Sequence, residues 1–383
     1  MQLKNFDVEE FLRDYWQKKP LLIKNPWETW RNPIDPDALA GLACEEEVES
    51  RLVTQVNGNW IVENGPLPVA RFGELGTFPW TVLVQAVDHY VAEVGALLAP
   101  FRFIPNWRID DVMVSLASDG GGVGPHFDQY DVFLVQGLGK RRWRVGAQCD
   151  AGSELAPHDE LRLLAQFEAT DEWVLEPGDI LYIPPRFAHD GVALGDDCMT
   201  FSIGFRAPSL SDLVGHYCDD LLENLCDDDR YCDPDLKRQS NPGEISEDAI
   251  TELHAMVART LGDRDAFARW FGCYNSTPKY SDVDWRPELP VDIGEIRELL
   301  GEGGLLCRNP ASRFSFIRNS ENRVSLFVDG ECFECGGDSA VFAEQLCAQE
   351  QIVVANKLHG ADDVVTLIVQ LVNLGSLAID EED

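Results

Sequence analysis

Short strand-like runs separated by glycine and proline fill the middle of the chain, from Asp111 to about residue 207. Most of them are rich in β-branched and aromatic residues and end at turn-forming residues, which is typical of β-strands. Many short strands of this kind favour a sandwich or barrel, of which the double-stranded jelly roll is one form. The runs are VMVSLAS, HFDQYDVFLVQG, RRWRVGA, WVLEPGDILYIPP and MTFSIGF.

Helical periodicity precedes these strands. Apolar residues recur at helical spacing from Phe11 to Trp16 and again from Val82 onward, as far as Phe101. Both segments are expected to be scaffold helices. Residues 1–208 are therefore predicted to form one α+β domain.

The strand pattern stops at Pro208, and two or three amphipathic helices are predicted over residues 209–284. Ser209 is expected to cap the first and Ser246 to begin the second, since a serine hydroxyl accepts a hydrogen bond from a free N–H of the first turn. A shorter helix holds Trp270. Because so few helices make a thin core by themselves, we expect this region to pack against a second copy of the chain and form a homodimer.

The last predicted domain covers residues 285–383. A helix near Ile296, a hairpin over residues 314–328 and two later helices are similar to a winged-helix module, which often binds DNA. The domain carries seven Lys and Arg against eighteen Asp and Glu, a net charge of −11, which opposes binding to a phosphate backbone. No direct contact with nucleic acid is therefore expected.

The whole chain is strongly acidic. It has 31 Lys and Arg and 67 Asp and Glu among its 383 residues, a net charge of −36. Two interpretations stay open: the surface attracts a basic partner, or the acidity reflects adaptation to high salt.

The sequence predicts a cytoplasmic protein. The first residues, MQLKNFDVEEFLRDYW, lack the basic start and apolar run of a signal peptide, and no apolar run approaches the roughly 20 residues that span a membrane. Eleven cysteines, scattered along the chain, favour reduced thiols over disulfides. Cys332 and Cys335 form a lone CxxC motif, for which core packing is preferred over metal or redox chemistry.

Two histidine-x-acid pairs occur, whereas roughly one is expected by chance from the composition. His158 with Glu160 lies in a polar stretch and is interpreted as exposed loop. His126 and Asp128 lie in a strand-like run, where alternate residues project to the same face and can bind one ion together.

A third ligand is predicted in the segment EPGDILYIPPRFAHDG. A turn at Gly178, a short strand and Pro184–Pro185 lead back to His189, which a jelly roll can bring to the first pair. Two imidazoles and one carboxylate on one side of a metal form a facial triad, which favours non-haem iron(II) used with oxygen. The alternative is that His126 and His189 are buried core histidines with satisfied hydrogen bonds.

These motifs resemble a known family. The HFD motif, a basic residue fifteen positions after its histidine, and PGDILYIPPxFxH resemble the JmjC class of cupin oxygenases that use 2-oxoglutarate. Within that class, YWQKKPLLIKN, GGGVGPHFDQYDVFLVQGLGKRRWRVG and SIGFRAPS closely resemble the bacterial ribosomal oxygenases, which hydroxylate an arginine of the large-subunit ribosomal protein called L-sixteen. The motifs cover about residues 10 to 208, and the resemblance of the remainder rests on architecture.

The resemblance implies a jelly-roll catalytic domain of the cupin and JmjC type, with iron(II) on His126, Asp128 and His189. It also implies that 2-oxoglutarate chelates the iron by its keto acid end and that O2 is the second co-substrate. The far carboxylate of 2-oxoglutarate is expected on Arg141, and the expected substrate is a basic ribosomal protein.

The position of Arg141 in the sequence agrees with that role. After a turn predicted over residues 137–140, Arg141, Trp143 and Val145 share one strand face, and the two apolar residues indicate that this face points inward. A buried guanidinium needs an anionic partner, and a carboxylate fits its two parallel N–H groups. The alternative is an ion pair between Arg141 and an acidic residue of the core.

Three further residues are predicted near the reaction site, each with a structural alternative. Ser115 donates a second hydrogen bond to 2-oxoglutarate, or is a satisfied hydroxyl of the barrel wall. Asp119 binds the guanidinium of a substrate arginine, or is a loop aspartate without such a role. Tyr130 lines the pocket beside the metal ligands, or packs in the core.

Other functions stay open at this point. The same chemistry on a histidine of another ribosomal protein, or on methyl-lysine, would use the same ligands. A cupin that only binds partners would have a degraded triad or lack the basic residue, and neither is seen here. A transcriptional regulator would need a basic recognition surface on the last domain, which its charge opposes.

Overall fold

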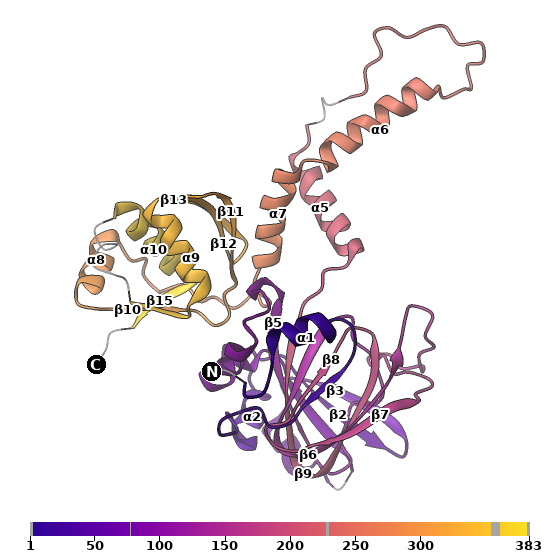
Figure 1. Cartoon of the computed structure of the whole chain (residues 1–383), viewed down its shortest axis with the longest axis vertical. Helices are drawn as coiled ribbons and strands as arrows, with labels where there is room; N and C mark the ends of the chain where they lie inside the picture. Colours follow the sequence, from indigo (N-terminus) through magenta and orange to yellow (C-terminus); the bar gives the residue numbers. More distant parts are fainter. Residues whose placement is uncertain (1–2, 77, 227–229, 354–360, 381–383) are drawn as a thin grey trace. The chain divides into compact units, whose positions relative to one another are not determined.

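The computed structural model describes residues 3–76, 78–226, 230–353 and 361–380. Contacts divide the chain into two compact units, Met1–Ala207 and Pro208–Asp383 (Figure 1). The predicted three-part division, with boundaries after residues 208 and 284, stays a prediction. No helix in the described part of the chain is long and apolar enough to cross a bilayer.

The first unit is built on a nine-stranded sheet whose neighbouring strands all pair antiparallel. The strand order is β1-β8-β6-β9-β5-β4-β2-β3, and β7 also pairs with β6. The strands are β1 (Leu21–Ile23), β2 (Ser50–Val56), β3 (Asn59–Asn64), β4 (Trp80–Val84), β5 (Ile109–Ala117), β6 (Asp131–Gln148), β7 (Ala169–Leu175), β8 (Ile180–Ile183) and β9 (Phe187–Phe205).

Two long strands, β6 and β9, run through both halves of this sheet. The first half of β6 pairs with β8 and with the second half of β9, whereas its second half pairs with β7 and with the first half of β9. The two strands therefore wrap the sheet around a common interior, as in a double-stranded β-helix. This confirms the predicted α+β fold with a jelly-roll domain.

The predicted turn over residues 137–140 is wrong. β6 continues from Asp131 to Gln148 without reversing, and its register against β9 shifts on both sides of Leu138. Gly139 has a φ of +61°, and a Cβ at this position would lie 3.1 Å from the Cα of Cys198. This part of the strand therefore bends through β-bulges, whose glycines look the same in a sequence as the glycines of a turn.

The predicted helix that starts at Val82 is wrong in its first part. Val82 lies in β4, four of whose five residues are buried, so the strand lacks the alternation by which a half-buried strand is recognised. The segment after β4 forms only short helical turns. The helices of this unit are α1 (Val8–Asp14), α2 (Pro36–Leu42), α3 (Val69–Gly73), η1 (Val87–His89), α4 (Ala92–Gly95), η2 (Ala96–Phe101) and η3 (Asn106–Arg108).

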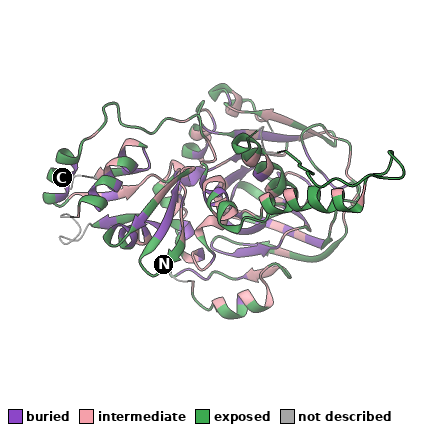
Figure 2. Cartoon of the chain, turned by 90° about the horizontal axis from the view of Figure 1, so that it is seen from above, coloured by how far each residue is buried: buried purple, intermediate pink, exposed green. Residues whose placement is uncertain are grey.

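Aromatic side chains fasten the N-terminal helix to the sheet. The ring centroid of Phe11 in α1 lies 4.9 Å from that of Tyr182 and 5.5 Å from that of Phe133. All three rings are buried, and in Figure 2 the buried residues follow the strands of the sheet. A separate buried cluster, which includes Leu134 and Trp143, fills the interior between the two halves of the jelly roll.

A buried carboxylate fixes the start of β6. Asp131 is fully buried and accepts hydrogen bonds from Tyr182 Oη (2.6 Å), Gln17 Nε2 (2.9 Å) and Arg108 Nη2 (3.2 Å). Burial raises the pKa of Asp131, although each of these donors acts to lower it. The network therefore joins β6 to β8 and to two segments outside the sheet.

The second unit combines helices with two three-stranded sheets, β14-β10-β15 and β11-β12-β13. Helix α7 packs on the latter, where a Cβ at Gly272 would lie 2.4 Å from the Phe327 ring. Ser209 and Ser246 cap α5 and α6, as predicted. The elements are α5 (Leu210–Asn224), α6 (Glu247–Leu261), α7 (Arg264–Ser276), α8 (Ile293–Gly301), β10 (Leu305–Arg308), β11 (Phe314–Ser320), β12 (Arg323–Val328), β13 (Glu331–Gly336), α9 (Asp338–Ala348), β14 (Gln351–Val353), α10 (Asp362–Asn373) and β15 (Leu377–Asp380).

The CxxC motif lies in β13. Cys335 is buried among apolar residues of the second unit, and burial raises the pKa of both Cys332 and Cys335 to about 11. Thiols that stay protonated are poor metal ligands and poor nucleophiles, which favours the packing role predicted for this pair.

Asp131→Ala is expected to lower the free energy of unfolding of the first unit by about 3–5 kcal/mol, because buried donors of Tyr182 and Arg108 lose their acceptor. Urea unfolding followed by circular dichroism measures the change. Glu172→Ala, at an exposed position of β7, is the control and should change the free energy by less than about 0.5 kcal/mol. Equal stability of the two variants would contradict the role assigned to Asp131.

Candidate metal centre

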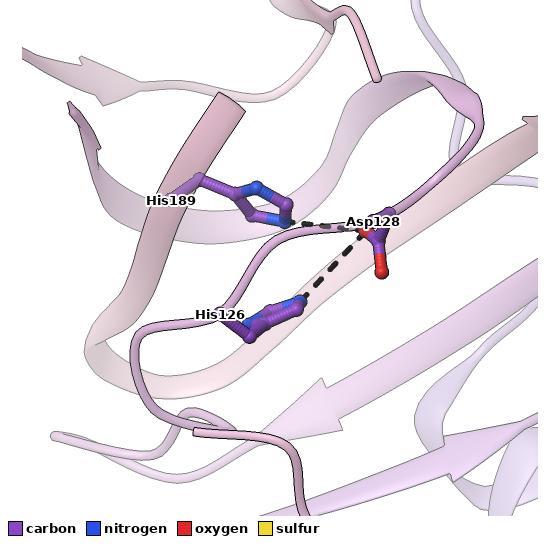
Figure 3. A group of neighbouring side chains, drawn as sticks. All are labelled: His126, Asp128 and His189. Carbon is purple, nitrogen blue, oxygen red and sulfur yellow. Dashed lines mark ion pairs between the residues drawn. The ribbon is translucent and has the colours of Figure 1, made fainter. Parts of the chain in front are cut away.

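His126, Asp128 and His189 converge at one end of the jelly-roll interior (Figure 3). The Nε2 atoms of His126 and His189 lie 3.9 and 3.5 Å from Asp128 Oδ2, and one ligand atom from each residue lies within 4.8 Å of the others. Across the described residues, this is the one group of three or more His, Cys, Asp or Glu arranged to hold a metal ion. The sequence pattern therefore identified residues that the fold brings together.

Backbone hydrogen bonds position the two histidines. The N–H of His126 donates to the carbonyl of His189 (3.0 Å), and the N–H of His189 donates to the carbonyl of His126 (2.8 Å). The N–H of Arg186 donates to the backbone carbonyl of Asp128 (2.6 Å). The segment that carries His126 and Asp128 is thus hydrogen-bonded directly to the segment that carries His189.

The spacing of His126 and Asp128 suggested one continuous strand, and this is wrong. His126 forms an isolated bridge with His189, Asp128 lies in the following loop, and β6 begins only at Asp131. Gly124, just before the pair, has a φ of +80° and packs against Trp60, and the strand expected from His126 onward begins only at Asp131. The two side chains still meet, because the bridge to β9 fixes the first and the Arg186 hydrogen bond fixes the backbone of the second.

Both imidazoles turn the same nitrogen toward the centre. His126 Nδ1 lies 2.8 Å from the Gly124 carbonyl and His189 Nδ1 lies 2.9 Å from the Phe187 carbonyl. A carbonyl oxygen only accepts, so we assign the proton to Nδ1 in each ring. The Nε2 lone pairs are then free to bind a metal ion.

The electrostatics suit the same role. Burial and, to a smaller extent, the neighbouring His126 together lower the pKa of His189 to about 4, so His189 is neutral near pH 7. Two imidazoles and a carboxylate are a donor set for a divalent transition metal. The residues present therefore fit the iron(II) ion that the motif predicts.

Tyr130 lies beside this centre, although 42% of the residue is exposed. Burial of its hydroxyl and the negative charge of Asp128 raise the pKa of Tyr130, so the phenol stays protonated. It therefore lies at the rim, between the metal ligands and the surface, and not in the core.

Arg141 points into the interior, as predicted from its alternation with Trp143 and Val145. It is 4% exposed, and neither its Nε nor its Nη2 atom has a hydrogen-bond partner among the described residues. These two atoms form one edge of the guanidinium, which is the edge that binds a carboxylate through two parallel bonds. The alternative of an ion pair with a core acid therefore has no support in the described part of the chain. Lys140, the neighbouring residue on the outer face of the strand, forms an ion pair with Glu176, with 2.5 Å between Nζ and Oε1.

Ser115 and Asp119 have partners within the protein. Ser115 is buried on β5, and its Oγ donates to the Thr200 carbonyl at 3.5 Å, a long contact. Asp119 is exposed, and its Oδ1 accepts from the N–H of Gly195 (2.7 Å). These bonds favour the structural alternatives for both residues, although the Asp119 carboxylate keeps one oxygen free to accept from a ligand.

His158 lies in a loop, as predicted. Its Nδ1 accepts from the N–H groups of Glu160 (3.1 Å) and Leu161 (2.9 Å), and its Nε2 lies 3.3 Å from the Trp60 carbonyl. Both ring nitrogens are used by the backbone, so this histidine has no free lone pair for a metal ion.

Two family models match the chain. A JmjC domain matches residues 96–213, which include the three converging residues, and a ROXA-like winged helix matches residues 258–378. The second match confirms the winged-helix fold predicted for the C-terminal part.

Comparisons with individual proteins, which cover most or nearly all of the chain, agree with both family matches. The ribosomal protein uL16 3-hydroxylase of Escherichia coli (strain K12) is 42% identical over 299 residues, which are 78% of this chain and 79% of that protein. A probable ribosomal oxygenase of Haemophilus influenzae is 38% identical over 343 residues, 84% of this chain and 81% of its own. A solved structure of YcfD, a ribosomal oxygenase from Escherichia coli in complex with cobalt and 2-oxoglutarate, matches with a TM-score of 0.87 and 36% identity and covers 99% of each chain.

His126→Ala is expected to weaken the binding of Mn(II) or Co(II) more than about 100-fold, because it removes one of three ligands. Isothermal titration calorimetry measures the affinity. His158→Ala is the matched control, since it removes a histidine that bonds only to its own loop and to β3. If the His126→Ala protein bound Mn(II) as tightly as the unchanged chain, His126 would not be a ligand.

Proposed function

The chain belongs to the ribosomal oxygenases of the JmjC class, and from that premise we propose that it hydroxylates an arginine side chain of a large-subunit ribosomal protein. Its cofactor is iron(II), and its co-substrates are 2-oxoglutarate and O2. One observation carries the proposal: two imidazoles and a carboxylate, of which His189 is buried, share an interior with Arg141, whose Nε and Nη2 have no partner among the described residues.

Each ligand has a defined role. His126 and His189 would bind the metal through Nε2, and Asp128 through its carboxylate, while the backbone carbonyls of Gly124 and Phe187 hold the imidazoles in place. When bound, iron(II) would supply the redox chemistry in which O2 converts 2-oxoglutarate to succinate and carbon dioxide and hydroxylates a substrate C–H bond.

Arg141 would fix the co-substrate. The guanidinium edge formed by Nε and Nη2 offers two donors to the far carboxylate, and burial makes each of these bonds stronger than it would be in water. The apolar cluster around it, which includes Leu134 and Leu181, excludes water from the carbon chain of the acid. Ser115 stays a proposed further donor to the same carboxylate, for which its hydroxyl would turn away from the Thr200 carbonyl.

The choice of an arginine substrate rests on similarity and charge. The uL16 hydroxylase relative acts on a ribosomal protein, and ribosomal proteins are basic, which matches a chain of net charge −36. Asp119 is the proposed partner of the substrate guanidinium, because its Oδ1 bond to Gly195 holds the carboxylate in place and leaves Oδ2 to accept. Tyr130 is proposed to line the entrance.

We propose that the enzyme acts in the cytoplasm, because its proposed substrate is a ribosomal protein. Direct binding of nucleic acid is not part of the proposal, since the C-terminal residues 285–383 carry a net charge of −11.

The protein is proposed to act as a homodimer through its helical region. All fifteen residues of α6 are described and none is buried, yet Ile250, Leu253, Val257 and Leu261 form an apolar stripe at helical spacing. Between 41% and 59% of each of these residues is exposed. Burial of such a stripe is favourable, and a second copy of the same helix offers a complementary apolar face.

Ribosomal proteins from cells that carry the gene are expected to include one large-subunit protein with an arginine heavier by the mass of one oxygen atom. Deletion of the gene should remove this mass, and expression of the His158→Ala protein, but not the His126→Ala protein, should restore it. Mass spectrometry of the isolated proteins is the measurement. The extra oxygen on a histidine, the loss of a methyl group from a lysine, or unchanged spectra would each refute the arginine substrate.

Leu253→Asp in α6 is expected to convert a dimer to a monomer, because it places a charge in the apolar stripe. Ala255→Asp is the matched control, since it adds the same charge to an exposed position on the opposite side of the helix. Size-exclusion chromatography with light scattering gives the mass of each. A dimer that survives Leu253→Asp would show that another surface joins the two copies.

A further inference from the structure

Trp143 carries a buried hydrogen-bond donor without a protein acceptor. The residue is 6% exposed, and its Nε1 atom has no partner among the residues that the structure describes. An indole N–H can only donate, and a buried donor without an acceptor is unfavourable. An acceptor from outside the protein would remove that cost.

Trp143 lies between the two ends of the proposed site. On β6 it follows Arg141 by two residues and shares its face, and the guanidinium carbon of Arg141 is 5.8 Å from the centroid of the indole ring. On the other side, the ring centroid of Trp143 is 5.9 Å from that of His189. A molecule that reaches from the metal ligands to Arg141 therefore passes the indole.

A glycine on the neighbouring strand β9 leaves space for the indole ring of Trp143. Gly191 of β9 is the direct cross-strand partner of Trp143, and a Cβ at Gly191 would lie 2.6 Å from Cζ3 and Cη2 of the indole. The benzene part of the indole thus packs directly against the backbone of Gly191, which has no side chain. The N–H is on the pyrrole part of the ring, away from that contact.

On this face of β6, three buried donors therefore lack an acceptor among the described residues: Arg141 Nε, Arg141 Nη2 and Trp143 Nε1. A carboxylate has two oxygens with about four acceptor positions, so one carboxylate can accept from all three. Two parallel bonds from Arg141 would leave lone pairs free for a third donor.

We propose that Trp143 is a binding residue for the co-substrate, whose indole N–H donates the third hydrogen bond to the carboxylate held by Arg141. The inference rests on the proposed function, because it takes 2-oxoglutarate as the molecule in the site. It assigns Trp143 a role in affinity for the organic acid and none in binding the metal ion.

The test compares two tryptophans that face each other across β6 and β7. Trp143→Phe keeps an aromatic ring and removes the N–H, and Trp173→Phe makes the same change at its cross-strand partner in the same apolar cluster. Binding of labelled 2-oxoglutarate is measured by equilibrium dialysis of the full-length protein with Mn(II) and without oxygen. Binding of Mn(II) alone is measured by electron paramagnetic resonance.

Trp143→Phe is expected to weaken 2-oxoglutarate binding about tenfold, the effect of losing one hydrogen bond to a charged group, with unchanged Mn(II) affinity. Trp173→Phe should change neither by more than about twofold. Trp143→His, which restores a ring N–H, should bind 2-oxoglutarate more tightly than Trp143→Phe.

Other outcomes overturn the inference. Equal 2-oxoglutarate affinity in Trp143→Phe and Trp173→Phe would show that the indole only packs. Weaker Mn(II) binding in Trp143→Phe would show that the ring acts through His189. If the unchanged chain bound Mn(II) but no 2-oxoglutarate, the proposed function itself would fail, and the role of Trp143 with it.

Discussion

The pair of backbone hydrogen bonds between His126 and His189 joins two segments that are 63 positions apart in the chain. Because each residue both donates to and accepts from the other, their Cβ atoms are held side by side, and a single carboxylate from Asp128 can reach both rings. The long strand β9 extends this pairing along β6. The fold of the first unit thus serves to hold three side chains around one point.

The interior behind those ligands combines apolar walls with donors that the protein leaves unpaired. Elsewhere in the same unit, two buried acids have partners: Asp131 accepts from three side chains, and Asp190 pairs with Arg144. Among the buried side chains that the structure describes, Arg141 is the one with two neighbouring guanidinium nitrogens that lack a hydrogen-bond partner. A buried guanidinium edge of this kind is suited to bind an organic anion.

Much of the site followed from the sequence, because its signals were local. Alternation predicted His126, Asp128 and the inward side of Arg141, and the turn and prolines before His189 predicted the third ligand. The irregular segments were not predictable, since Gly139 with a positive φ serves a bulge as well as a turn, and the alternation from His126 to Tyr130 looks like that of a paired strand although β6 begins only at Asp131. The helical spacing from Val82 is misleading because a strand buried on both faces has no period of two.

The central claim is that three side chains hold one metal ion with an organic acid beyond it. A crystal of the full chain grown with Mn(II) and 2-oxoglutarate, with anomalous diffraction recorded for manganese, tests this directly. The account predicts one anomalous peak bonded to His126 Nε2, His189 Nε2 and Asp128, with the far carboxylate of the acid on the Nε and Nη2 edge of Arg141. A peak at another place, or His189 turned away from the ion, would contradict it.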